Sequence, residues 1–315
     1  MGVTVTAYPP YQPYQPYQPY QAYPGPAAAP IAPPPILVAV AAPARQRRLL
    51  VALRLILVVP HLIVLFLISI AAFVAAFIGW WGALFTGRLP RFAVNFLSGY
   101  LRWSTRVSAY MMLLTDVYPP FTPDDDPGYP VRVAIPEPQR LNRAAVFFRA
   151  ILLTPVAIFS SIIRYGTMVM ALVAWVITLA TGRLPYSFHL AYVAALRFQT
   201  RFNGYEFMLT PAYPSGLYGD GPDAAGWADA APRGFGAPAF GYGPPGGYGG
   251  YDQAPADPAP GAQASPWLLP LTSAGKALVT TFIVIGALCL IGQNVYDNTT
   301  LNNGQPTTNA VLISV

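Results

Sequence analysis

Two arginine-bearing motifs have the residue types and spacing that suit recognition of an anion. They are Arg102-x-x-Thr105-Arg106 and, 95 residues later, Arg197-x-x-Thr200-Arg201. Arginine is costly in lipid and is retained there when it has a partner. Two neighbouring guanidiniums can make bidentate contacts with a phosphate or an anionic lipid headgroup. The alternative is that these side chains reach the membrane interface, or pair within the protein, and only fix its topology.

Other chemistry finds little support in the sequence. His61 and His189 do not correspond under the 95-residue offset and have no nearby set of Cys, Asp or Glu, whereas a zinc site needs three or four ligands. The acidic Asp116 and Glu206 do not match each other either, which leaves paired-carboxylate catalysis unsupported. Cys289 is the single cysteine and lies in an apolar run. No nucleotide-binding or nucleophile motif occurs, so we expect no enzyme, no catalytic residue, no metal and no cofactor.

The composition favours a membrane protein. Apolar residues make up 54% of the 315 residues and charged residues 10%, against about a quarter in soluble domains. Residues 62–84 carry no charge, and about 20 such residues cross the hydrocarbon core as a helix. The alternative, a buried helix of a large soluble core, lacks polar partners to surround it. The net charge of +6 comes from arginines that flank apolar segments, which suits anionic headgroups better than nucleic acid.

An internal duplication organises the middle of the chain. Residues 54–119 align without a gap with 149–214, and identical Arg, Trp, Gly, Pro and Tyr residues share one register. Each unit is predicted to contain an apolar helix interrupted at Pro60 or Pro155, a tight turn and a second, polar-striped helix. The turn is Thr-Gly-Arg-Leu-Pro in both units, with Gly as helix cap and Pro starting the next element. Its structural residues are Gly87, Arg88, Pro90, Gly182, Arg183 and Pro185.

The predicted fold class is an all-α integral membrane protein with a duplicated helical unit, a C-terminal transmembrane helix and disordered arms rich in Pro, Tyr and Gly. Tyr-Gln-Pro triplets predict an extended first arm, and Gly, Pro and Asp predict a flexible second linker. The expected segments are an arm at 1–44, unit 1 at 45–121, an acidic linker at 122–139, unit 2 at 140–214, a linker at 215–266, the C-terminal helix at 267–293 and a polar tail at 294–315.

The distribution of arginine predicts the topology. Arg45, Arg47 and Arg48 precede the first apolar helix, which favours a cytoplasmic N-terminus in the plasma membrane. Arginines also precede the second unit, so the starts of both units are expected in the cytoplasm, with each unit a hairpin whose turn lies on the far side. Arg88, Arg91 and Arg183, which would lie on that far side, weaken this prediction. No cleavable signal peptide is evident, and the C-terminal tail is expected outside the cytoplasm.

The residues of the first unit resemble a known family. The stretch 84–92 (LFTGRLPRF), then 101–110 (LRWSTRVSAY) and 113–121 (LLTDVYPPF), is similar to the DUF4389 family of bacterial membrane proteins, common in actinobacteria. The second unit keeps the turn, Arg197, Arg201 and Tyr205, but has Phe198 for Trp103 and Pro211 for Asp116. The resemblance covers about 50–215. It implies a membrane location and a duplicated domain, and carries over no catalytic residue.

Two functions remain open from the sequence. The first is a non-enzymatic scaffold or accessory component of the cell envelope that recruits protein partners through its Pro/Tyr-rich arms, since polyproline segments dock into aromatic grooves. The second is a pseudo-symmetric transporter, or a lipid- or anion-binding protein, that uses the paired arginines. In both, the bilayer and anionic lipids are the expected partners, self-association is allowed and nucleic acid is not expected.

Overall fold

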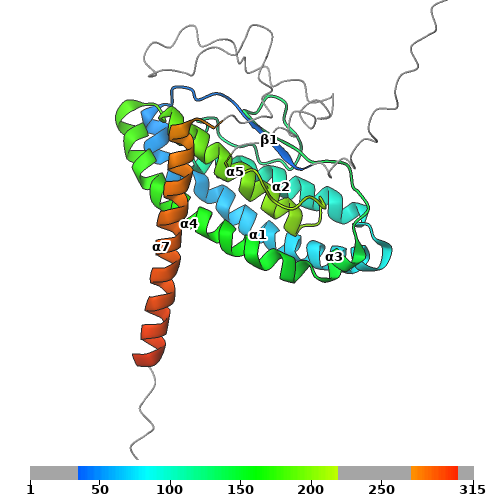
Figure 1. The fold of residues 1–315 in the computed structure, drawn as a ribbon. Helices are drawn as coiled ribbons and strands as arrows, with labels where there is room; N and C mark the ends of the chain where they lie inside the picture. Colours follow the sequence, from blue (N-terminus) through cyan, green and yellow to red (C-terminus); the bar gives the residue numbers. More distant parts are fainter. Residues whose placement is uncertain (1–34, 219–270, 304–315) are drawn as a thin grey trace, which may run out of the picture. The chain divides into compact units, whose positions relative to one another are not determined.

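The computed structural model describes residues 35–218 and 271–303, all within one unit of the chain, 33–315 (Figure 1). The described part is mostly helical, as predicted. Its elements in chain order are β1 (Leu37–Val40), α1 (Arg48–Thr86), α2 (Arg91–Met111), β2 (Val131–Ala134), α3 (Arg143–Phe147), α4 (Arg149–Thr181), α5 (Tyr186–Glu206) and α7 (Ser273–Asn303). Of the arms expected to be disordered, residues 1–34 of the first (1–44) and 219–266 of the second (215–266) lie outside the described residues, as do 267–270 of the expected C-terminal helix and 304–315 of the polar tail.

The same turn ends α1 and α4. Gly87 and Gly182 take left-handed conformations, with φ of 71° and 73°, which glycine adopts without the steric cost of a Cβ. The amide of Gly87 donates to the carbonyl of Ala83 at 2.8 Å, and that of Gly182 to Thr178 at 2.7 Å. A threonine hydroxyl closes each turn, as Thr86 donates to the carbonyl of Gly82 and accepts from the amide of Arg88. Each turn therefore sends the chain back along the helix it has just left.

The two repeats exchange contacts reciprocally. The amide of Gln46, before α1, donates to the carbonyl of Gly182 at 2.9 Å; the amide of Leu141, 95 residues later, donates to Gly87 at 2.9 Å. The tryptophans do the same, because Trp80 Nε1 donates to the carbonyl of Val146 and Trp175 Nε1 to that of Val51, both at 2.9 Å. When residue i contacts j and the counterpart of j contacts the counterpart of i, the two units are related by a two-fold axis. Here that axis relates the two halves of one chain.

The axis passes between α2 and α5. The hydroxyls of Thr105 and Thr200, which are equivalent residues of the two repeats, lie 3.3 Å apart in the core. Thr200 donates its single proton to the carbonyl of Leu196 at 2.8 Å, so Thr105 is the donor in the contact between the threonines. The duplication seen in the sequence is thus also a pseudo-symmetric packing unit.

This reciprocity makes α1 and α4 antiparallel. Each turn lies against the start of the other repeat, so the two starts, at Gln46 and at Leu141, are at opposite ends of the α1–α4 pair. If α1 and α4 both spanned a membrane, the two repeats would therefore start on opposite sides of it, whereas the arginines predict both starts on one side; the sidedness stays a prediction. The sequence showed that the units are alike but held no information on their relative direction.

A two-stranded antiparallel sheet interrupts the expected all-helical architecture. β1 pairs with β2 in the register Leu37 to Ala134 and Val40 to Val131. β1 lies within the segment expected to be a disordered arm, and β2 lies within the expected acidic linker. β1 packs on α5 and β2 on α2, and Figure 1 shows α2 and α5 between β1 and the long helices. The strands therefore fasten residues 37–40 and the inter-repeat segment to the second helices.

Within the described residues, three helices are long and apolar enough to cross a membrane, namely Arg48–Thr86, Arg149–Thr181 and Ser273–Asp297. The last belongs to α7, which packs mainly on α4 and α5. Glycines allow the closest approach, because a Cβ on Gly166 would lie 1.8 Å from the carbonyl oxygen of Phe282, and one on Gly286 would lie 1.8 Å from that of Ile162. Small residues let helix backbones approach in this way. Beyond this crossing, residues 291–297 are exposed.

The α4–α7 crossing gives a matched test of packing. We expect Gly286→Ala to destabilise the protein by about 1–3 kcal/mol, because the new methyl group must displace a backbone carbonyl. Gly292→Ala is the control, since a Cβ there meets nothing within 4 Å. The melting temperatures of both variants in detergent measure the effect. Equal melting temperatures would contradict the packing of α7 on α4.

Candidate functional site

The four arginines singled out by the sequence do not converge on one site. Arg106 and Arg201, at 2% and 6% exposure, are buried. Arg106 Nη2 donates to the carbonyl of Thr122 at 3.2 Å and to that of Asp124. Arg201 donates to the carbonyls of Ile36, at 3.2 Å, and Ser215, at 2.9 Å. Each guanidinium thus fastens a non-helical segment onto the second helix of its own repeat.

The other two members of the set differ from each other. Arg197 is buried at 2% exposure. Arg102 is half-buried and lines a surface pocket that also includes Ser98, Asp124 and Glu137. Arg102 is therefore the residue of the predicted set that is most open to a ligand, and it shares its pocket with two acidic residues.

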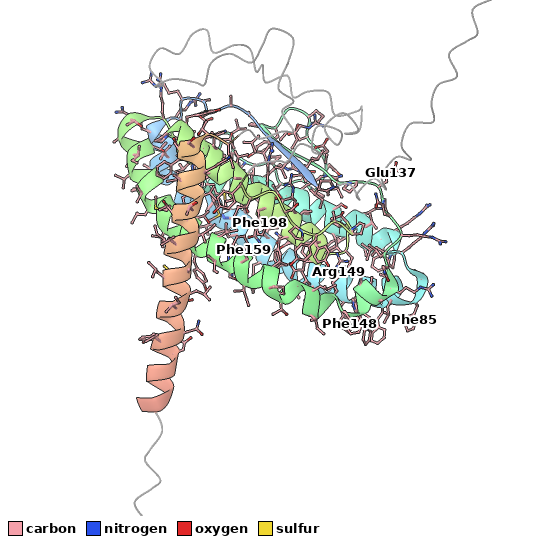
Figure 2. All side chains as sticks on the ribbon, viewed as in Figure 1. Phe85, Glu137, Phe148, Arg149, Phe159 and Phe198 are labelled. Carbon is pink, nitrogen blue, oxygen red and sulfur yellow. The ribbon has the colours of Figure 1, made fainter. Side chains whose placement is uncertain are left out.

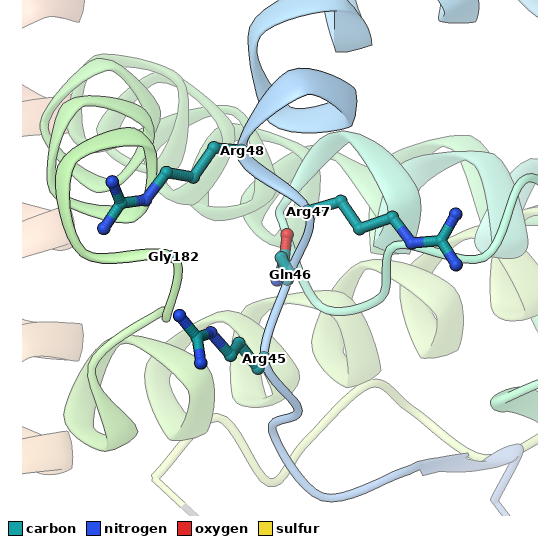
Figure 3. A pocket seen from close by; sticks show the side chains of 5 residues that line it. All are labelled: Arg45, Gln46, Arg47, Arg48 and Gly182. Carbon is teal, nitrogen blue, oxygen red and sulfur yellow. The ribbon is translucent and has the colours of Figure 1, made fainter.

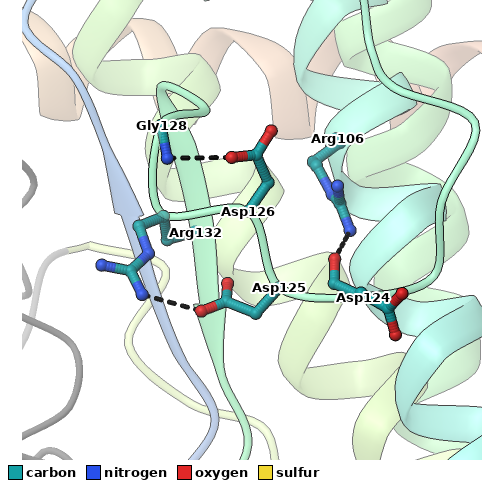
Figure 4. A network of polar contacts seen from close by, with 6 residues as sticks. All are labelled: Arg106, Asp124, Asp125, Asp126, Gly128 and Arg132. Carbon is teal, nitrogen blue, oxygen red and sulfur yellow. Dashed lines mark hydrogen bonds and ion pairs between the residues drawn. The ribbon is translucent and has the colours of Figure 1, made fainter.

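The segment that Arg106 holds is acidic and tightly ordered (Figure 4). Arg132 forms an ion pair with Asp125 at 2.7 Å, and the Asp126 carboxylate accepts from the amide of Gly128 at 2.9 Å. The side chain of Arg106 reaches the backbone of Asp124 beside them. Burial lowers the pKa of Arg106, and the nearby Tyr129 and the carboxylates raise it. The acidic run predicted as a linker is therefore a fixed cover over α2.

A second pair of equivalent arginines, Arg54 and Arg149, anchors the start of each long helix. The Arg54 guanidinium lies 4.4 Å from the ring centre of Tyr110, and that of Arg149 lies 3.8 Å from Tyr205. Both donate to the backbone carbonyl of the same tyrosine, at 2.6 Å for Arg54 Nη1 and 3.0 Å for Arg149 Nε. Figure 2 shows Arg149 within the helical layers. The sequence predicted no site here, although the repeat alignment pairs both arginines and both tyrosines.

The turn residues of the predicted set occupy the two ends of the α1–α4 pair. Gly87 and Gly182 are the left-handed caps, and Pro90 and Pro185 stand at the N-caps of α2 and α5. Arg88 is exposed, and Arg183 lies beside Gly182 in the other turn. With the arginines that precede α1 and α4, these residues give each end of the pair a cluster of positive charge.

The two histidines lie in different surroundings. His61 is buried, accepts from Trp103 Nε1 at 3.3 Å and stacks on Phe121 with ring centres 3.8 Å apart. Burial lowers the pKa of His189 to about 4, so its ring is neutral at physiological pH. Within residues 35–218 and 271–297, no group of three or more His, Cys, Asp or Glu side chains has the proximity that a metal ion needs.

These observations define a mostly helical protein with an internal two-fold repeat and, in the part of the chain that the structure describes, three helices long and apolar enough to cross a membrane. The family described as "Domain of unknown function (DUF4389)" matches residues 48–122 and 143–217. The chain therefore carries two tandem DUF4389 domains, and the predicted family is confirmed. No curated protein and no solved structure matches the chain.

The different burial of the arginines predicts different tolerance of lysine. Arg201→Lys keeps the charge but cannot reach two carbonyls on separate segments, so we expect a loss of about 1–3 kcal/mol from a buried acceptor left unpaired. Arg102→Lys, at a half-buried position, is expected to change stability by about 0.5 kcal/mol or less. Thermal unfolding of the two variants in the same detergent checks this. A smaller loss for Arg201→Lys than for Arg102→Lys would contradict the anchoring role.

Proposed function

We propose that the protein is a non-enzymatic scaffold of the plasma membrane, whose duplicated core is seated in one face of the bilayer and whose arms recruit partners. The observation that carries this proposal is the contrast between the two sides of the core. The outer faces of α1 and α4 are apolar, while the opposite side carries the acidic segment and the β-ribbon. Figure 2 illustrates the difference, with Phe85 and Phe148 on the side of the long helices and Glu137 on the ribbon side.

Exposed apolar side chains occur along both long helices. In α1 the exposed residues recur at steps of three and four opposite the packed face, as with Phe66 and Phe73, which are 67% and 73% exposed. In α4, Met168, the equivalent of Phe73, is 73% exposed, and Leu172 is 67% exposed one turn further on. Soluble monomers rarely expose contiguous apolar patches beyond about 300–600 Å². Lipid is the partner that fits such a surface.

The position of Arg164 in α4 supports an orientation of this helix in the plane of the membrane. Arg164 is exposed and lies midway along α4 (Arg149–Thr181). In a spanning helix it would stand near the bilayer centre, where arginine costs about 3 kcal/mol or more. In a helix lying at the interface the same side chain reaches the headgroups. The 33 residues of α4 also extend roughly 50 Å, well beyond the hydrocarbon thickness of about 30 Å.

The cover over α2 supports the same orientation. A Cβ on Gly99, near the middle of α2, would lie 2.8 Å from Pro123, which immediately precedes Asp124. If α2 crossed the bilayer beside α1, this acidic, non-helical segment would meet lipid at the membrane centre. Irregular backbone facing lipid does not occur there. The α1–α4 layer therefore faces lipid while the α2–α5 layer faces the aqueous side.

An in-plane core also accommodates the arginines at both ends of the long helices. All of them then lie on one side, the cytoplasm, as the positive-inside rule favours. α7 is the helix that spans the membrane, because it passes the α4 layer and extends beyond it on the side away from β1 (Figure 1). This leaves the N-terminus in the cytoplasm and the C-terminal tail outside it.

Cysteine accessibility separates three topologies. In a Cys289→Ser background, single cysteines replace Arg47, Arg88, Arg140 and Arg183, and an impermeant thiol reagent is applied to intact cells and to inverted vesicles. An in-plane core predicts that all four positions react from the cytoplasmic side, because they lie at the ends of interfacial helices.

The other two patterns would each contradict the in-plane core. Antiparallel spanning helices place positions 47 and 183 on one side and 88 and 140 on the other. Two hairpins with turns on the far side place 47 and 140 together and 88 and 183 together.

The scaffold role is tested on the first arm. β1 begins at Leu37, so residues 1–34 can be replaced without removing the strand. Proximity labelling identifies the proteins that lie near the intact chain. When residues 1–34 are replaced by a Gly/Ser segment of equal length, we expect these neighbouring proteins to be no longer labelled, while the variant stays in the membrane. A matched replacement of 219–266 measures how much of the protein capture depends on the second arm. An unchanged set of captured proteins in both variants would contradict recruitment.

The pseudo-two-fold arrangement also favours the second candidate function, binding of anionic lipids. Equivalent arginines stand at equivalent places of the two repeats, as in membrane proteins built from internal repeats. Among the predicted residues, Arg102 is the half-buried one that lines a pocket. Loss of anionic-lipid binding in Arg102→Gln, with unchanged stability, would favour this role of the site.

A further inference from the structure

The start of α1 meets the α4–α5 turn in a basic pocket (Figure 3). The pocket is lined by Arg45, Gln46, Arg47, Arg48 and Gly182. The Nε atoms of Arg45 and Arg48 lie 3.9 and 3.7 Å from the point where a Cβ of Gly182 would stand. Figure 3 shows these two guanidiniums on either side of Gly182, whereas Arg47 points the other way. Two like charges from the start of one repeat are thus brought together at the turn of the other.

The backbone of this pocket is held in place while its charges are left open. Gln46 is buried; its amide bonds the carbonyl of Gly182, and its side chain bonds the carbonyl of Leu113 and the guanidinium of Arg54. The three arginines around it are exposed, and none forms an ion pair with a carboxylate of the described residues. A preformed pocket with adjacent guanidiniums matches the geometry of a phosphate group.

The equivalent junction of the other repeat provides an internal comparison; there Arg143 Nε lies 3.6 Å from the point where a Cβ of Gly87 would stand, and Arg140 is not among the three nearest atoms. Arg140 and Arg143 correspond to Arg45 and Arg48, and Gly87 corresponds to Gly182. There the first turn of α3 is capped by Asn142, whose Oδ1 accepts from the amide of Ala144 at 3.0 Å. In the first repeat Arg47 takes the place of Asn142, and the start of α1 has no side-chain cap and no acidic residue in its first turn. The two junctions have arginines at equivalent sequence positions, but at the α1 end a further positive charge replaces the acceptor.

We propose that the junction of Arg45, Arg48 and Gly182 is a binding site for a phosphate group, with an anionic lipid headgroup as its source. The two guanidiniums contact the phosphate oxygens, and the open amides at the α1 N-terminus add partial positive charge. The exposed apolar side chain of Leu49, 71% exposed, follows directly on Arg48 and continues into the apolar face of α1. A lipid bound at its headgroup therefore has a surface for its acyl chains. This inference rests on the proposed membrane seat of the core.

The test uses full-length protein in phosphatidylcholine nanodiscs. Short-chain phosphatidylglycerol and inorganic phosphate are titrated separately by calorimetry, which distinguishes a lipid headgroup from a free phosphate as the source. The double variant Arg45→Gln/Arg48→Gln is expected to weaken phosphatidylglycerol binding by about tenfold or more, since two charge-assisted contacts are lost. The matched control is Arg140→Gln/Arg143→Gln, which removes equal charge from the junction capped by Asn142 and is expected to change binding by about twofold or less.

A second pair of variants tests the open helix end. Arg47→Asn introduces the residue that caps the other repeat and is expected to weaken binding more than Arg47→Gln, which removes the same charge without a short capping side chain. Because the three arginines are exposed, the variants are expected to have the same melting temperature as the unmodified protein. If the double variant fails to fold, the site is tested by comparing Arg47→Asn with Arg47→Gln: weaker lipid binding by Arg47→Asn supports the site, and equal binding contradicts it.

Three outcomes would overturn the site. They are equal loss in both double variants, no loss in either, and saturable binding of inorganic phosphate that exceeds that of the lipid. The first would make the effect one of net charge only. A wrong in-plane orientation would be recognised separately. It would change the cysteine accessibility of positions 47, 88, 140 and 183, whereas the lipid titrations could still give the expected result.

Discussion

The backbone hydrogen bonds between each turn and the start of the other repeat are the constraint on which the remaining arrangement depends. The carbonyls of Gly87 and Gly182 accept from Leu141 and Gln46, both at 2.9 Å. These bonds form only if the two long helices run antiparallel and each glycine adopts its left-handed conformation. Each repeat thus supplies the cap region of its partner, and neither has a complete set of backbone partners by itself. The tryptophan bonds and the threonine contact on the axis follow from the same geometry.

Antiparallel packing determines where the charge lies. Arginines at the starts and turns of the repeats form a basic cluster at each end of the α1–α4 pair, whereas the acidic segment is held across α2 by Arg106 and Arg132. An apolar face bordered by arginine at both ends, with carboxylates on the opposite layer, suits the cytoplasmic surface of an anionic membrane. A spanning orientation of the same helices would place half of the end arginines on the other side and Arg164 near the bilayer centre. The proposed in-plane orientation and the proposed phosphate site therefore depend on the same antiparallel packing.

The repeat, its turn and the helices long enough to cross a membrane could be predicted from the sequence, because these are local or periodic signals. The relative direction of the repeats could not, since nothing within 54–119 records how 149–214 packs against it. The strand at Leu37–Val40 was missed because four residues next to a Pro/Ala-rich stretch acquire strand structure only by pairing with β2. The burial of Arg106 and Arg201 was also hidden, because their acceptors are backbone carbonyls, which leave no trace in residue identity. The equivalent tryptophans, Trp80 and Trp175, could have indicated contacts between the repeats, because the N–H of a Trp in an apolar helix needs an acceptor.

The most direct test of the pseudo-two-fold core is an engineered disulfide on its axis. In a Cys289→Ser background, Thr105→Cys and Thr200→Cys replace hydroxyls that lie 3.3 Å apart. Mild oxidation of the protein in its membrane, followed by mass spectrometry of its non-reduced peptides, is expected to give an intramolecular 105–200 disulfide in high yield. The mismatched pair Ser104→Cys/Thr200→Cys should give little, because the Ser104 hydroxyl is directed to the carbonyl of Leu101. Free thiols at 105 and 200, or a disulfide formed only between two chains, would contradict the reciprocal packing of the repeats.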